Sequence, residues 1–384
     1  MHRARATFRT SAMHTREPRT LPFTKRAVLL LTVLACGPAL GACGSSDIEQ
    51  PPAASVDPRL YQDAGARAPA VAEKSHAEKE REAVDAVNRA MGGDFKALTP
   101  LFDPDADFSF SPGMVDASDR DGMLKALGDA FAAFSDRKYA ARDIWLAEDA
   151  AIVAWDMQAM QSGDYMGIKP TGKQVGIKGL TILWFQANGL IKDMHLYMDV
   201  GAVLAQLGAA PKGADVSAPS VTLATSPEVF VAAGNDQEQK NIAILNASYD
   251  ALEAKNEAGF LAPFADDVEV FRLDHDGPVR GKEERRKYFK TITHGLSQFS
   301  QDPKYAWGVG PFAIEEYVLK GINSGPLGPA QATGHSVNLH LVDVNEMKDG
   351  KIVRKWSFGN SLELLAQTGV VDRASPAATS PLVH

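Results

Sequence analysis

Two parts of the chain carry apolar residues at helical spacing, and each part is followed by segments with the two-residue period of strands. Val84, Val87 and Met91 lie three and four residues apart, which predicts one buried face of a helix. The same spacing recurs later in the chain at Ile242, Leu245, Tyr249 and Leu252. We also expect a short helix before Phe102 and before Phe264. A third helix is predicted over 123–134 and over 282–293.

Strand patterns follow these helices in both parts. Alternation predicts strands over 151–160, 174–185 and 190–199, and then over 312–320, 336–347 and 352–360. Asn188-Gly189 and Asp349-Gly350 separate the last two strands of each series, and both pairs tolerate the positive φ of a type I′ hairpin turn. Three helices followed by such a meander predict an α+β fold, in which a curved, mainly antiparallel sheet wraps the helices.

The two series are diverged copies of one domain. Trp155 aligns with Tyr317 at a numbering offset of 162, and after a one-residue deletion Asn188 aligns with Asp349 at an offset of 161. Because several segments share these offsets, we expect two tandem domains. The expected organisation is a signal peptide over 1–42, a flexible tether over 43–75, domains over 76–208 and 236–370, a linker over 209–235, and a loose tail over 371–384.

The N-terminus predicts export. A basic segment precedes the apolar run 27–35, which is too short to span a bilayer. The run leads to Leu40-Gly41-Ala42-Cys43, which resembles the cleavage site of bacterial lipoproteins and makes Cys43 the predicted site of lipidation. An ordinary secretory signal is the alternative. Cys36 and Cys43 are the only cysteines, so the mature protein would have no thiol left for disulfides or metal sites.

Charge argues against nucleic acid as a partner. Of the 40 Lys and Arg and 48 Asp and Glu, the first 42 residues hold seven basic residues and one acidic residue. The mature chain therefore has 33 basic and 47 acidic residues and a net charge of −14, which repels phosphate backbones. We expect contact with a membrane only through the lipid anchor.

Several motifs resemble the polyketide-cyclase-like (SnoaL-like, ester cyclase) branch of the NTF2-like superfamily. They are Pro170-Thr171-Gly172 before a strand, the Asn-Gly hairpin, and the ending from Tyr197-Met198-Asp199 to 204–208. The resemblance covers residues 80–208 and, more weakly, 237–370. It implies two cone-shaped NTF2-like domains. Such domains host cyclases, isomerases, dehydratases, epoxide hydrolases and plain binding modules, so the resemblance leaves the reaction open.

The last strand of the first copy supplies the main catalytic candidates. His195, Tyr197 and Asp199 alternate, so we expect all three on the concave face that lines the pocket. The resemblance implies that Asp199 is a general acid/base, with His195 and Tyr197 orienting it or stabilising an enolate. The alternatives are that Asp199 caps the final helix and that the other two residues are structural.

Other candidates are less specific. Asp156 interrupts an apolar strand, so it either pairs with Asp199 across the pocket or lies at the solvated end of the strand. In the second copy Asn360 replaces Asp199 and cannot exchange a proton near neutral pH, so we expect any activity in the first copy. Further candidates for ligand contact, any of which packing or surface placement would also explain, are Trp155, Asn338, His340, Trp356 and Asn360.

No metal site and no cofactor are expected. Residues 274–277 combine two Asp with one His, but neighbours on a turn rarely converge on one ion. The sequence contains no His-Glu-x-x-His motif, no Gly-rich phosphate loop and no nucleophile elbow.

Two functions remain in competition. One is a binding protein of the cell envelope that holds a small hydrophobic molecule or docks a protein partner. The other is a cyclase-like enzyme in the first copy that uses Asp199, with an isomerase or hydrolase in the same pocket as a further alternative. Export favours binding, because cyclases of antibiotic pathways act in the cytoplasm. We also expect the two domains to pair through their sheets as an internal pseudo-dimer.

Overall fold

The structure, a computed structural model, describes residues 75–111, 114–210, 221–273 and 275–371. These residues belong to one compact unit, Val71–His384. The predicted signal peptide, the lipidation site Cys43, nearly all of the predicted tether and all but the first residue of the tail lie outside the described residues. No helix in the described part is long and apolar enough to cross a membrane.

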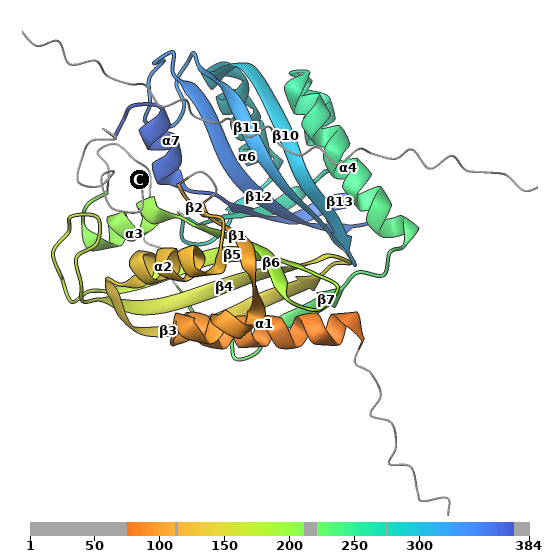
Figure 1. Cartoon of the computed structure of the whole chain (residues 1–384). Helices are drawn as coiled ribbons and strands as arrows, with labels where there is room; N and C mark the ends of the chain where they lie inside the picture. Colours follow the sequence, from red (N-terminus) through yellow and green to blue (C-terminus); the bar gives the residue numbers. More distant parts are fainter. Residues whose placement is uncertain (1–74, 112–113, 211–220, 274, 372–384) are drawn as a thin grey trace, which may run out of the picture. The chain divides into compact units, whose positions relative to one another are not determined.

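The first domain consists of helices and one sheet. Its elements are α1 (His76–Gly92), the 3-10 helix η2 (Phe95–Leu101), β1 (Phe102–Phe110), β2 (Val115–Ala117), α2 (Arg120–Phe131), β3 (Phe134–Leu146), β4 (Ala150–Gln161), β5 (Gln174–Phe185), β6 (Ile191–Met198) and α3 (Val200–Leu207). The strands are ordered β2-β1-β6-β5-β4-β3-β7, and β1 runs parallel to β6. Figure 1 shows α1, in orange, beside β3.

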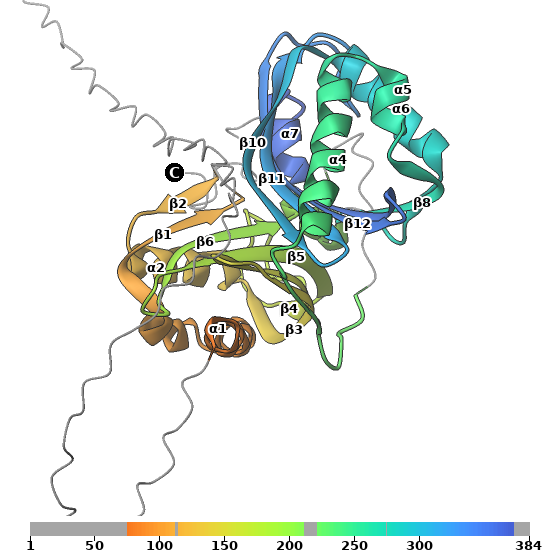
Figure 2. The same cartoon turned by 90° about the vertical axis from the view of Figure 1, so that its right-hand side faces the viewer.

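The second domain repeats this order. Its elements are α4 (Asp236–Glu253), α5 (Glu257–Leu261), β8 (Phe264–Arg272), β9 (Val279–Arg280), α6 (Lys282–Gly295), β10 (Leu296–Val309), β11 (Phe312–Asn323), β12 (Ser336–Lys348), β13 (Lys351–Phe358) and α7 (Ser361–Gln367). The strands are ordered β10-β11-β12-β13-β8-β9, with β13 parallel to β8. Figure 2 shows α4 running beside β10 and β11. The predicted α+β class with two tandem domains is confirmed.

Both long helices begin with a capping box. Ser75 accepts a hydrogen bond from the Glu78 amide and its own amide donates to the Glu78 side chain, and Asn235 and Glu238 do the same at the start of α4. The apolar positions that predicted these helices face the cores: Val84, Val87, Met91, Leu245, Tyr249 and Leu252 are all buried.

The segment that we expected to be only a linker contains a strand. β7 (Glu228–Val231) pairs in parallel with β3, so that Ile144 lies opposite Val229. The strands β1, β3, β8 and β10 were also not predicted. Burial does not alternate regularly along β3 and β10, and it alternates over only part of β1 and β8.

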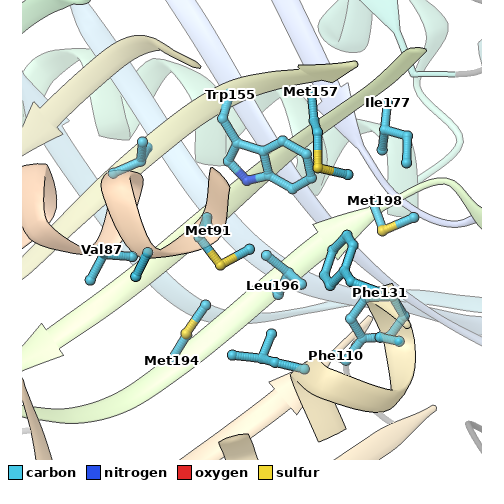
Figure 3. Close-up of a cluster of buried hydrophobic side chains, with 14 of the residues drawn as sticks. Val87, Met91, Phe110, Phe131, Trp155, Met157, Ile177, Met194, Leu196 and Met198 are labelled. Carbon is cyan, nitrogen blue, oxygen red and sulfur yellow. The ribbon is translucent and has the colours of Figure 1, made fainter. Parts of the chain in front are cut away.

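The inner face of each sheet is the face toward the helices of its own domain. In the first domain this interior is filled by apolar side chains. Figure 3 shows Met91, Met157 and Leu196 near the Trp155 ring, and all four residues are buried. A Cβ at Gly179 would overlap the Trp155 indole, so this position needs a glycine for the ring to lie across β5.

The outer faces of the two sheets share one buried apolar cluster. The first domain contributes Trp145, Ala147, Ala150, Ile152, Ala154, Leu180, Ile182, Trp184 and Tyr197, and the second contributes Leu273, Trp307, Val309, Phe312, Ile314, Val342, Val344 and Phe358. Each sheet is therefore covered by apolar contacts on both of its faces.

Candidate functional site

The three main candidates of the first domain do not line the cone. On β6 the side chains of Met194 and Leu196 join the interior core, whereas Tyr197 belongs to the outer cluster. The prediction that His195, Tyr197 and Asp199 face the concave side is therefore wrong. Because β6 is buried on both faces, alternation defines two sets of side chains without telling which set faces the helices.

His195 and Tyr197 instead contact the second domain. The His195 Nδ1 lies 2.6 Å from the Glu316 Oε1, and the Tyr197 hydroxyl donates to the same oxygen over 2.5 Å. Burial disfavours the charged imidazole, but the Glu316 carboxylate outweighs burial and leaves the pKa of His195 raised. Burial also raises the pKa of Tyr197 well above its ordinary value.

Asp199 is a helix cap. Its Oδ1 accepts hydrogen bonds from the Ala202 amide (3.2 Å), the Ser361 amide (3.1 Å) and the Ser361 hydroxyl (2.7 Å). Asn360 takes the equivalent position in the second domain, where its Oδ1 accepts from the Leu362 amide (3.1 Å) and from the Val200 amide (3.2 Å). Each residue therefore caps its own helix and also binds the first turn of the equivalent helix in the other domain.

Asp156 neither meets Asp199 nor lies in solvent. It is 4% exposed and lies on the outer face, where the nearest cation is Arg142, with Nη1 3.6 Å from Oδ1. Burial raises the pKa of Asp156, against the opposing effect of Arg142 and Lys178. Both alternatives that we weighed for this residue are wrong, because an acid on a strand buried on both faces finds its cation on the neighbouring strand.

Two of the aromatic candidates are packed in place. The Trp155 indole donates to the Thr181 hydroxyl (3.0 Å) and stacks on Tyr139. Trp356 lies on the outer face of the second sheet and stacks on Phe271, with ring centroids 5.3 Å apart and planes 10° apart. Trp155 therefore fills the first cone instead of lining an open pocket.

The interior of the second domain holds a buried network of polar side chains, which we call the polar cluster: Asp343, Lys355, Tyr249, Tyr317 and Ser357. Asp343 forms an ion pair with Lys355 and accepts hydrogen bonds from Tyr249 (2.7 Å), Tyr317 (3.0 Å) and Ser357 (2.6 Å). The Lys355 ammonium also donates to the Tyr249 hydroxyl over 3.2 Å. Asp343 and Lys355 are 1% and 3% exposed, so this ion pair is shielded from water.

Glu315 lies opposite Asp343 on the neighbouring strand. Burial and the Asp343 charge raise the pKa of Glu315 to about 8, although Lys355 and a hydrogen bond from Gln301 oppose the shift. Burial lowers the pKa of Lys355 to about 8, and Lys355 in turn holds the pKa of Asp343 below its ordinary value in spite of burial. Near neutral pH the interior therefore contains one ionised and one protonated carboxyl group.

The equivalent positions of the first domain are mostly apolar. At the shared offsets Lys355 corresponds to Met194, Ser357 to Leu196, Tyr317 to Trp155, Tyr249 to Val87 and Asp343 to Thr181. One fold thus encloses an apolar core in the first domain and the polar cluster in the second. The geometry favours the second domain as the place of a candidate site, in contrast to our expectation.

A cavity of about 170 Å³ opens beside the polar cluster. Ser357 lines this cavity and also donates to Asp343, so it connects the cavity with the cluster. The remaining lining comes from Asp199, Arg272, Leu273, Leu339, His340, Leu341, Gly359, Asn360, Ser361, Glu363 and Leu364. A larger groove of about 990 Å³ along α4 is lined by no member of the cluster. Ser357 also lines a cavity of about 250 Å³, but the rest of that lining includes Trp356 and Phe358 of the outer face. We place the site at the smaller cavity, which Leu339 and Leu341 of the inner core line.

Of the two candidates on β12, only His340 reaches this cavity. Its Nδ1 lies 3.0 Å from the Glu363 Oε1, and burial raises the pKa of Glu363. Asn338 is exposed, and its backbone exchanges two hydrogen bonds with the Gln367 side chain. The same pair of hydrogen bonds joins Gly176 to Gln206 in the first domain, which makes it a feature of the fold and not of a site.

Comparison with known proteins agrees with this architecture. The model of the SnoaL-like polyketide cyclase family matches residues 81–207, and the model of a SnoaL-like domain family matches residues 245–355. The chain contains two tandem SnoaL-like domains. Their strands and helices are those of the NTF2-like fold.

Solved structures resemble single SnoaL-like domains. IdmH of Streptomyces antibioticus, described as a candidate polyketide cyclase, is 26% identical, with a TM-score of 0.31 and coverage of 34% of this chain and 98% of IdmH. AclR of Streptomyces galilaeus, a candidate hydroxylase, is 22% identical, with a TM-score of 0.33 and coverage of 36% and 85%. A candidate SnoaL-like polyketide cyclase of Jannaschia sp. CCS1 is 17% identical, with a TM-score of 0.33 and coverage of 36% and 98%. No curated protein matches the chain.

The polar cluster of the second SnoaL-like domain escaped the sequence analysis. Helical spacing identifies Tyr249 only as part of a buried face, and Lys355 and Ser357 flank Trp356, the residue of their strand that we predicted to contact a ligand. One signal was available, since Asp343 stands between Val342 and Val344 in an apolar strand. Within the described residues, no three His, Cys, Asp or Glu side chains are placed to hold a metal ion.

Proposed function

We propose that this protein is a lipid-anchored binding protein of the cell envelope, whose second SnoaL-like domain holds a small molecule and whose first SnoaL-like domain is a scaffold. The observation that carries the proposal is the contrast between the two interiors. The first is filled around Trp155, whereas the second contains the polar cluster and the cavity that Ser357 connects to it. Buried polar groups with a nearby cavity are typical of ligand sites.

The cavity selects the chemistry of the ligand. Leu339, Leu341 and Leu364 offer apolar contact, while Ser357 and His340 offer hydrogen bonds. Its volume of about 170 Å³ equals roughly six water molecules at about 30 Å³ each. The ligand is therefore a small molecule, or one end of a larger molecule, with an apolar body and an oxygen that faces the polar cluster.

The N-terminal segment supports the proposed location in the cell envelope. The basic segment, the apolar run 27–35 and Cys43 support export and acylation, with residues 43–75 as a tether. Radiolabelled palmitate incorporated into the wild-type chain but not into Cys43→Ser would support the anchor. Equal labelling of both chains would contradict it.

A second candidate function is acid–base catalysis in the same domain, as in an isomerase or cyclase. The observation that favours it is the separation of two carboxyl groups, with the pKa of Glu315 at about 8 and that of Asp343 lowered. A protonated carboxyl group and a carboxylate side by side are what proton transfer next to a carbonyl requires. Asp343, and not Asp199, would then be the base.

Binding is tested with three small probes, cyclopentanone, phenol and benzoate, by saturation-transfer NMR on the mature chain. At least one probe should bind, and Ser357→Leu should weaken that binding about tenfold, because Leu occupies this position in the first domain and would fill the cavity. Thr291→Leu, on the exposed side of α6, adds the same bulk elsewhere and should leave binding unchanged. If no probe binds, or if Ser357→Leu binds equally well, the proposal is wrong.

The catalytic candidate has its own readout. In D₂O the α-hydrogens of cyclopentanone should exchange faster with the wild-type chain than with Asp343→Asn. Binding without any accelerated exchange would leave the binding function standing and exclude this proton transfer.

A further inference from the structure

A buried carboxylate joins the outer faces of the two sheets. Glu316 on β11 is 3% exposed, and its Oε1 accepts hydrogen bonds from His195 (2.6 Å) and Tyr197 (2.5 Å) on β6 of the first domain. We call these three residues the carboxylate lock. Within the described residues the second oxygen of Glu316 has no hydrogen-bond partner. The hydrogen bonds of this carboxylate are therefore those from His195 and Tyr197.

The lock has no polar counterpart at the symmetry-related place. At the offsets of the repeat Glu316 corresponds to Ala154, His195 to Trp356 and Tyr197 to Phe358. These three counterparts all belong to, or pack against, the same apolar cluster between the sheets. Over these six positions the interface therefore has one polar half and one apolar half, although it is built from two copies of the same domain. Elsewhere on the outer face of the first sheet, Asp156 and Arg142 also carry charge.

The helix caps show the same asymmetry. The Asp199 carboxylate of the first domain binds the Ser361 amide, and the Asn360 amide of the second binds the Val200 amide. A carboxylate and an amide side chain thus cap adjoining helix starts, where two identical domains would place two identical groups. Gly201 allows the approach, because a Cβ there would overlap the Ser361 hydroxyl.

We infer that the carboxylate lock determines which domains can associate through their outer faces. A first domain binds a second domain and does not bind another first domain, and a second domain does not bind another second domain. The partner that this surface fits is the unlike domain of the same chain. The lock gives specificity in two ways, because it stabilises the unlike pair and raises the free energy of both like pairs.

The penalty follows from what each wrong pair would bury. Two second domains would set Glu316 against Trp356 and Phe358 and leave two carboxylates without donors. Two first domains would set His195 and Tyr197 against Ala154, and would bring two Asp199 carboxylates together at the helix caps. A buried group without its partner lowers the affinity of such a complex about 100-fold or more, so the like pairs are excluded.

The test uses the full mature chain with a protease site placed in 211–220 and cut after purification. Native mass spectrometry then counts the like and unlike pairs of fragments after two differently isotope-labelled preparations are mixed. The wild-type fragments should form unlike pairs only, with like pairs about 100-fold rarer. β7 stays with the second fragment and can still join β3, but this contact is common to all variants.

The decisive variant copies the apolar half of the interface onto the lock, as Glu316→Ala with His195→Trp and Tyr197→Phe. It should keep a matched interface and raise the share of like pairs at least tenfold. Glu316→Ala alone, which leaves His195 and Tyr197 without their acceptor, should weaken the unlike pair and permit pairs of second domains, because the new alanine faces Trp356 and Phe358 as Ala154 does in the wild type. Pairs of first domains should stay rare. The inference is overturned if wild-type fragments form like pairs freely, or if the triple variant remains as selective as the wild type.

Discussion

Lys355 occupies the place in the second domain that Met194 occupies in the first. Lys355 lies opposite Asn345 on the neighbouring strand, Met194 lies opposite Leu183, and these partners are also equivalent in the repeat. An ammonium group therefore stands where the first domain has a thioether in an apolar core. The fold tolerates both, since the Asp343 carboxylate and the Tyr249 hydroxyl bind the charge.

This exchange leads to a prediction about stability. Lys355→Met should lower the free energy of unfolding by about 3–5 kcal/mol, because it leaves Asp343 buried without its cation. Adding Asp343→Thr, which copies Thr181 of the first domain, should restore a large part of that loss. Urea denaturation of the wild type and the two variants measures both effects. A Lys355→Met variant as stable as the wild type would show that Asp343 does not depend on Lys355.

A second prediction concerns pH. Since the pKa of Glu315 is raised to about 8, the folded state keeps a proton that the unfolded state releases near the ordinary pKa. Stability from this group is present at low pH and is lost as pH rises towards 8. Glu315→Gln imitates the protonated form, so it should stabilise the protein by roughly 4 kcal/mol at pH 8 and by less than about 1 kcal/mol at pH 5. Thermal denaturation at both pH values checks this, and an equal effect at both would contradict it.

A third prediction compares two glycines of the first domain. Gly179→Ala should destabilise the domain by roughly 2 kcal/mol or more, because the new methyl group overlaps the Trp155 indole. Gly128→Ala lies inside α2 with no atom within 4 Å of the new Cβ, and should stabilise by about 0.5–1 kcal/mol. Melting temperatures that move in the same direction for both variants would argue against a tightly filled first core.

A fourth prediction separates the two roles considered for Asp199. As a cap, Asp199→Asn should change stability by less than about 0.5 kcal/mol, since Asn caps helices as well as Asp, whereas Asp199→Ala should cost about 1–2 kcal/mol. Asp199→Asn should also retain the exchange of cyclopentanone hydrogens, because the amide keeps the shape of the cavity wall that Asp199 forms. Loss of that exchange in Asp199→Asn would return the acid/base role to the first domain.

The domain architecture could be predicted because it rests on features that repeat along the chain. The duplication is predicted by the alignment of Trp155 with Tyr317 and by the two hairpin turns. The apolar spacing of Val84, Val87 and Met91 predicts a helix. Local patterns of this kind depend on neighbours in sequence, so they survive divergence of the two copies.

The site could not be found in the same way, because it depends on which face of a strand turns inward. β6 and β13 each have helices on one side and the other sheet on the opposite side, so both sets of alternate residues include buried side chains. The predicted residues His195 and Trp356 each lie one position from Met194 and Lys355, whose side chains face the interior, and a shift by one residue exchanges the two faces. The short strand β7 was missed because four residues among Pro, Ala and Ser carry little periodic signal.

β7 also sets how far the chain can reach. Once β7 is paired with β3, only residues 232–235 separate it from the first residue of α4. Four extended residues span at most roughly 14 Å, so the start of α4 can move only a short distance from β3 while β7 stays paired. Exchange of second domains between two molecules would first require β7 to separate from β3. The pairing of β7 with β3 therefore opposes the exchange of second domains between molecules, even at the high local concentration that the proposed lipid anchor would produce.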